Sequence, residues 1–192
     1  MVSYVLDFLN HYLTLPVVFA ALLGGCLCWL ICRREEKLGK ITRKEWAAFT
    51  ALSVYLILVF LMLIFTRTIK NGRHFSLQLF WSYRAIAAGK RQLLYLDVLN
   101  VLLFVPFGLL CPMAERKPGF WKTAGFGAGL SLLIELAQGL TERGLFELDD
   151  LFHNIVGTAL GAGLWLLFSR RRAEQAEIAR KMAEDLSDSE GQ

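Results

Sequence analysis

Acidic and amide side chains occur inside apolar stretches of this chain, where ionisable groups are costly and usually functional. Glu135 and Gln138 lie about one helical turn apart, and Asp149, Asp150 and Asn154 follow. A carboxyl group held away from water can act as a general acid or base. We therefore interpret Glu135 and Asp150 as candidate catalytic residues, with polar helix-to-helix adhesion as the alternative.

The other candidate site residues share a capacity to bind or stabilise rather than to react. They are Arg67, Asn100, Gln138, Arg143, Asp149 and Asn154. If Arg67 pairs with Glu135, that carboxylate is only structural. Asp149 and His153, four residues apart, could face one hard cation, but this spacing is not diagnostic of a metal site. Without a P-loop or glycine-rich nucleotide motif, we expect neither a metal nor another cofactor.

The elements that carry these residues are long and apolar. The chain of 192 residues is 55% hydrophobic and 20% charged, which excludes a disordered chain. Its apolar residues form blocks of about 20, the length that spans a bilayer. The pattern predicts an all-α polytopic membrane helix bundle in residues 1–168 and a charged cytoplasmic tail in 169–192. About five transmembrane helices are expected, over residues 14–32, 47–65, 94–113, 120–140 and 151–168.

Basic residues predict the orientation of these helices. Of 21 Lys and Arg residues, 14 fall in the segments that five alternating spans place on one side, and the N-terminal tail holds none. Because basic loops stay in the cytoplasm, we expect the N-terminus outside and the C-terminus inside. The pI of about 9.0 then reflects topology, and no nucleic-acid partner is expected.

Alternation also brings the polar residues to one face of the membrane. Apart from Lys122, the strongly polar groups within the spans lie in their outer halves. Four residues are expected to shape helix packing: Pro106, Gly108, Gly157 and Gly161. Pro106 removes a helical hydrogen bond and should bend its helix, and the G-x-x-x-G of the last pair permits close approach. The aromatic segment 66–92 is expected along the outer interface, as an anchor or a lid.

Three blocks of these residues carry a resemblance. Asn100-Val-Leu-Leu-Phe-Val-Pro-Phe-Gly108, Ser131-Leu-Leu-Ile-Glu-Leu-Ala-Gln138 and the run from Arg143 to Gly157 resemble, in order, the motifs of the VanZ-like family of bacterial membrane proteins. Arg67 resembles the arginine that the family has after the second span. The resemblance covers about residues 50–165. His153 departs from the family pattern, which commonly has an apolar residue there.

The resemblance implies a multi-pass protein of the bacterial cytoplasmic membrane, typical of Gram-positive bacteria. The family is associated with low-level resistance to teicoplanin, a lipoglycopeptide. Three functions stay open: an envelope protein that lowers lipoglycopeptide action through an outer-face polar site, a membrane enzyme acting on a lipid-linked headgroup or cell-wall precursor, and a structural or accessory subunit. The expected partners are membrane lipids and either a lipoglycopeptide or a lipid-linked precursor, and the oligomeric state stays open.

Overall fold

The computed structural model describes residues 15–65, 75–115, 118–142 and 144–190, without the side chains of 15–17, 64–65 and 185–190. Its helices are α2 (Leu15–Lys37), α3 (Arg43–Phe60), the π-helix η1 (Leu61–Phe65), α4 (Trp81–Ala87), α5 (Gln92–Met113), α6 (Phe120–Thr141) and α7 (Leu148–Glu190). The strands are β1 (Phe75–Ser76) and β2 (Phe146–Glu147). The prediction of an all-α helical bundle is confirmed, with one two-stranded sheet added to it.

Four helical segments within the described residues are long and apolar enough to cross a membrane. They are Arg43–Leu63, Gln92–Met113, Phe120–Thr141 and Leu148–Glu184. The first expected span, residues 14–32, falls largely in α2 but begins outside the described residues. The count of five spans and the orientation of the N-terminus therefore stay predictions.

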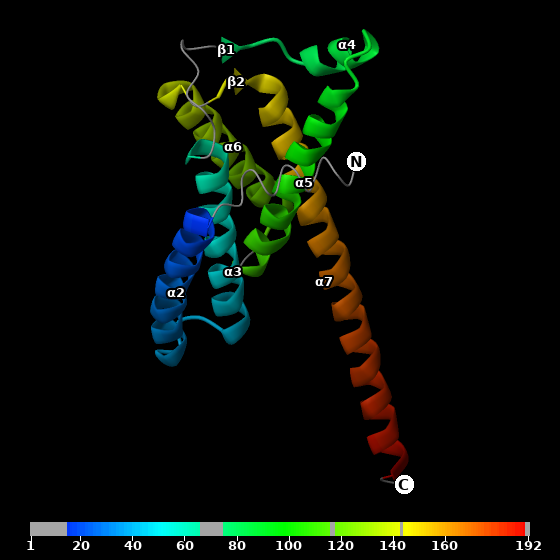
Figure 1. Ribbon diagram of the computed structural model, residues 1–192. Coiled ribbons are helices and arrows are strands. Elements are labelled where there is room, and N and C mark those ends of the chain that lie inside the picture. The colour runs from blue at the N-terminus through cyan, green and yellow to red at the C-terminus, as the bar shows by residue number, and fades with distance from the viewer. Residues whose placement is uncertain (1–14, 66–74, 116–117, 143, 191–192) are drawn as a thin grey trace.

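The bundle is built around α5 and α7, which lie side by side (Figure 1). Helix α6 packs against α7, α3 packs against α5, and α2 lies along α3. Helix α4 and both strands gather at one end of the bundle, whereas the α2–α3 turn and the C-terminal part of α7 lie at the other (Figure 1).

Glycines hold α5 and α7 at close range. A Cβ atom on Gly108 would lie 2.1 Å from the carbonyl oxygen of Thr158, and one on Gly161 would lie 2.1 Å from that of Val105. Since these contacts involve backbone atoms, a side chain at either position would push the helices apart. Helix α5 continues through Pro106, and the bend expected there stays a prediction.

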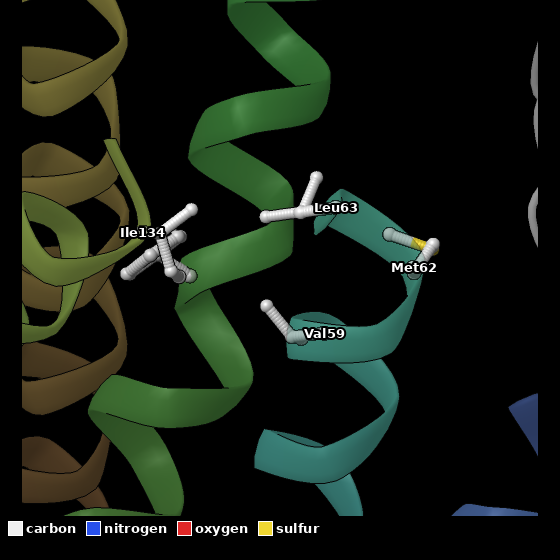
Figure 2. Close-up of a cluster of buried hydrophobic side chains, with 5 residues drawn as sticks. Val59, Met62, Leu63 and Ile134 are labelled. Atoms are coloured by element: carbon white, nitrogen blue, oxygen red, sulfur yellow. The ribbon is translucent and has the colours of Figure 1, made fainter. Parts of the chain in front are cut away.

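A small apolar core joins α3, η1, α5 and α6. Phe104 is fully buried at its centre. The rest of the cluster is Val59, Met62, Leu63 and Ile134. Figure 2 shows Val59 and Leu63 on the side of their helix that is turned toward Ile134. Helix α3 begins with a capping box: Thr42 and Glu45 each accept the other's backbone N–H.

Helix α7 is far longer than the expected span. It runs without a break from Leu148 to Glu190, so the segment after residue 168 continues the same helix. All its described side chains from 170 to 184 are exposed. Residues 169–190 contain no proline or glycine that would end the helix. The expected span therefore ended at residue 168 because the apolar residues end there, although the helix does not.

Candidate polar site at the α4 end of the bundle

Helix α4 is attached to α7 by a buried carboxylate. Asp149, only 1% exposed, accepts hydrogen bonds from the backbone N–H groups of Phe80 and, at 2.9 Å, Ser82. The residue before the helix, Phe80, adopts a left-handed conformation with φ of 62° and gives α4 no side-chain cap. Asp149 therefore supplies from another helix the acceptor that the first N–H groups of α4 require.

A second attachment lies just before α4. Strand β1 pairs in parallel with β2, with Phe75 opposite Phe146 and Ser76 opposite Glu147. The two phenyl rings are in contact, with centroids 5.6 Å apart. The sheet and Asp149 together fasten residues 75–87 to the segment that joins α6 to α7.

Glu135 and Gln138 position the neighbouring backbone. The carboxylate of Glu135, 2% exposed, accepts the N–H of Glu147 at 2.9 Å, which ties β2 to α6. The amide of Gln138, 1% exposed, donates to the carbonyl of Leu63 at 3.2 Å. Leu63 lies in the π-helix, a local widening that often occurs at functional sites.

Two amide side chains join the other helices to α7. Asn100 on α5 donates to Asp150 at 2.7 Å, and Asn154 donates to Ser131 on α6 at 2.8 Å. The polar residues of α5, α6 and α7 therefore do face one another, which periodicity alone left open. The buried carbonyl oxygens of Gln138 and Asn154 have no hydrogen-bond partner in the described part of the chain. Each is available to a further donor.

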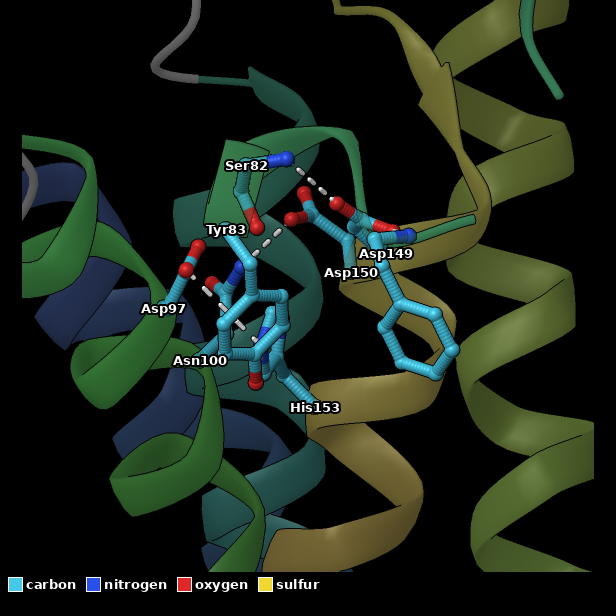
Figure 3. A network of polar contacts seen from close by, with 8 residues as sticks. Ser82, Tyr83, Asp97, Asn100, Asp149, Asp150 and His153 are labelled. Atoms are coloured by element: carbon cyan, nitrogen blue, oxygen red, sulfur yellow. Dashed lines mark hydrogen bonds and ion pairs between the residues drawn. The ribbon is translucent and has the colours of Figure 1, made fainter. Parts of the chain in front are cut away.

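A histidine, a tyrosine and an aspartate form another part of the site (Figure 3). Buried His153 lies with Nε2 2.8 Å from the Tyr83 hydroxyl and 3.9 Å from an Asp97 carboxylate oxygen. Burial raises the pKa of the Tyr83 phenol, and the carboxylates of Asp97 and Asp149 raise it further. Sequence reasoning did not place Tyr83 or Asp97 in the site, although His153 lies one turn after Asp149 and marks the same helix face.

An open groove of about 550 Å³ lies between the segment before α4 and the segment that joins α6 to α7. Its lining mixes aromatic and aliphatic groups with a hydroxyl, an amide and a carboxylate: Phe75, Ser76, Leu77, Gln78, Trp81, Leu145 and Glu147. Glu147 also donates its N–H to Glu135, so the groove adjoins that buried side chain. An apolar wall with a few polar groups is the usual lining of a ligand site.

The remaining predicted site residues divide into two groups. Arg67 and Arg143 lie outside the described residues. Gly157 lies against α5, where a Cβ atom would be 2.1 Å from the carbonyl oxygen of Val101. Within the described residues, no group of three or more His, Cys, Asp or Glu side chains is placed to hold a metal ion.

Comparison with known proteins decides the relationship. The sequence model of the VanZ/LLP1 family matches residues 46–169, which include every described polar residue of the site. The chain belongs to the VanZ-like family. The resemblance of its three sequence blocks is thereby confirmed.

This VanZ-like chain is also similar to a curated relative. It is 35% identical to Protein VanZ of Enterococcus faecium over 81 residues, which are 42% of this chain and 50% of that protein. The chain thus spans about half the length of the curated relative it matches. No solved structure matches it.

Proposed function

We propose that this VanZ-like membrane protein lies in the bacterial cytoplasmic membrane and lowers susceptibility to lipoglycopeptides such as teicoplanin. The observation that carries the proposal is the groove beside Glu135, with Phe75, Leu77 and Trp81 on its apolar side and Glu147 among its polar groups. An amphiphile with an acyl tail and a polar head matches that lining.

The predicted orientation supports this proposal. The distribution of basic residues predicts that the α4 end of the bundle faces outside, where lipoglycopeptides and exported cell-wall precursors meet. Indole and phenol side chains such as Trp81 and Tyr83 favour the headgroup layer. If the groove binds the antibiotic or the lipid-linked precursor, the two molecules meet less often. The antibiotic then binds fewer of its precursor targets.

The test is teicoplanin susceptibility in a sensitive Gram-positive host. The strains carry empty vector, wild type, Glu135→Gln or Glu142→Gln, with membrane abundance matched by immunoblot. Glutamine keeps an oxygen to accept the N–H of Glu147 but removes the charge of Glu135. Glu142, the residue that ends α6, is the control, because its substitution removes one carboxylate from the same end of the same helix.

We expect wild type and Glu142→Gln to protect the host and Glu135→Gln to protect it weakly or not at all. Against a glycopeptide that has no acyl tail, the wild-type protein should protect the host less than it does against teicoplanin. Equal protection by Glu135→Gln would exclude a role for that charge. A wild type that gives no protection at full abundance would refute the proposed function.

A second candidate is an enzyme that acts on a lipid-linked headgroup or cell-wall precursor. The burial of Glu135 next to the groove favours it, with Asp150 as a second acid–base candidate. Mass spectrometry of extracted lipids separates the two functions. An enzyme predicts a precursor of altered mass in the wild type that is absent with Glu135→Gln, whereas a binding protein predicts unchanged precursor masses.

The accessory-subunit alternative has weaker support. A partner helix would pack against the close-approach residues Gly157 and Gly161, but both face α5 of the same chain.

A further inference from the structure

A basic pocket lies at the end of the bundle opposite α4, between the last turns of α2 and the first turn of α3 (Figure 1). Its volume is about 360 Å³. The lining consists of two indoles, three cations and one carboxylate: Trp29, Arg33, Glu36, Lys37, Arg43 and Trp46. The proposed function uses none of these residues.

The cations of the pocket have no ion-pair partner among the residues that the structure describes. Within the described part of the chain, no carboxylate lies within 4.0 Å of the charged nitrogens of Arg33, Lys37 or Arg43. The nearby acids are engaged elsewhere: Glu35 pairs with Lys40 at 2.8 Å, and Glu45 accepts from the cap of α3 at 2.7 Å. The pocket therefore keeps an excess of positive charge.

The two tryptophans fix the geometry of this charge. The indole N–H of Trp46 donates to the carbonyl of Trp29 at 3.2 Å, which joins α3 to α2. The guanidinium carbon of Arg33 lies 4.8 Å from the centroid of the Trp29 ring, a cation–π contact. A stacked guanidinium loses less freedom when its N–H groups bind a phosphate.

We propose that this pocket binds the phosphate of an anionic membrane phospholipid such as phosphatidylglycerol. Basic pockets between membrane helices at the cytoplasmic side bind anionic headgroups, and tryptophan prefers the same depth of the bilayer. Charge complementarity selects an anionic lipid over a zwitterionic one. The basic run Arg170, Arg171 and Arg172 follows the last expected span and favours the same leaflet.

The chain offers a matched pair of variants. The pocket variant combines Arg33→Gln with Arg43→Gln and removes two cations that line the pocket. The control variant combines Lys40→Gln with Lys44→Gln and removes two nearby cations that do not line it. All four side chains are exposed, so neither change disturbs the core. Both double changes remove two positive charges, and the Lys40 change also breaks the ion pair with Glu35.

The experiment measures lipid binding to the purified full-length protein by native mass spectrometry. Phosphatidylglycerol, phosphatidylcholine of the same acyl composition and soluble glycerol 3-phosphate are titrated separately. We expect the wild type to bind phosphatidylglycerol most tightly, and the pocket variant to bind it roughly ten- to thirty-fold more weakly. The control variant should stay within about two-fold of the wild type.

Three outcomes would overturn the proposal. Equal loss in both variants would mean that general surface charge, not the pocket, attracts the lipid. Unchanged binding in a pocket variant that keeps its circular dichroism spectrum would remove these residues from any lipid site. Glycerol 3-phosphate binding as tightly as the lipid would make a soluble phosphate ester the ligand.

Discussion

Substitution of Gly157 by alanine tests one of the close backbone contacts between α5 and α7. The added Cβ atom would lie 2.1 Å from the carbonyl oxygen of Val101 and 3.0 Å from Cβ of Phe104. Ordinary contact begins at 3.4 Å, so α5 and α7 would have to separate locally by about 1.3 Å. Because the opposing atom belongs to a helix backbone, it cannot rotate away as a side chain would.

This strain gives the expected magnitude. Overpacking of a filled interface typically costs about 1–3 kcal/mol. The control is Gly163→Ala on the same helix, where an added Cβ atom meets nothing within 4 Å. That change gives α7 a better helix former and should be neutral or stabilising by up to about 1 kcal/mol.

Thermal unfolding of the purified protein in detergent measures the difference. For a chain of this length, a loss of 1 kcal/mol lowers Tm by about 2–4 °C, so Gly157→Ala should melt about 2–12 °C below the wild type. Gly163→Ala should melt at or slightly above the wild type. If the two alanine variants have the same Tm, the close contact between α5 and α7 is refuted.

Three further predictions concern the other contacts of the site. Asp149→Ala should speed amide hydrogen exchange at Ser82 by about 10- to 100-fold, because a hydrogen bond to a carboxylate contributes about 1.5–3 kcal/mol; unchanged exchange would exclude that bond. Gly127→Ala, whose Cβ atom would lie 2.3 Å from a threonine hydroxyl, should lower Tm, whereas Gly125→Ala, with nothing within 4 Å, should not; equal Tm values would contradict this packing. Since burial and nearby carboxylates raise the pKa of Tyr83, an alkaline ultraviolet titration of wild type minus Tyr83→Phe should show a phenol that ionises above the ordinary pKa of about 10. A difference midpoint at or below that value would contradict the assigned surroundings.

Hydropathy predicted the membrane helices closely. The expected spans 94–113 and 120–140 correspond to α5 (Gln92–Met113) and α6 (Phe120–Thr141). The thickness of the bilayer fixes the length of such segments, so single-sequence reasoning is reliable there. Hydropathy does not show that α7 continues unbroken past the apolar segment, because the extension is helical but polar.

The sequence predicted several residues of the polar site but not their hydrogen-bond partners. The alternation of the spans placed Glu135 and Asp149 at one face of the membrane, yet it did not show that each binds a backbone N–H. Asp149 binds Phe80, 69 positions away in the chain, and such a partner follows only from tertiary packing. The same reason hid the β1–β2 pairing, since two-residue strands leave no periodic pattern.

The cap that Asp149 gives to α4 has a consequence for biosynthesis. A helix of seven residues is unstable alone, and the acceptor for its first N–H groups, like the partner of β1, is encoded in residues 146–149. During synthesis the ribosome completes residues 75–87 well before those residues emerge. The α4 end of the bundle is thus assembled only when the beginning of α7 arrives. A nascent chain halted before residue 145 carries one wall of the groove, from Phe75 to Trp81, without the other wall.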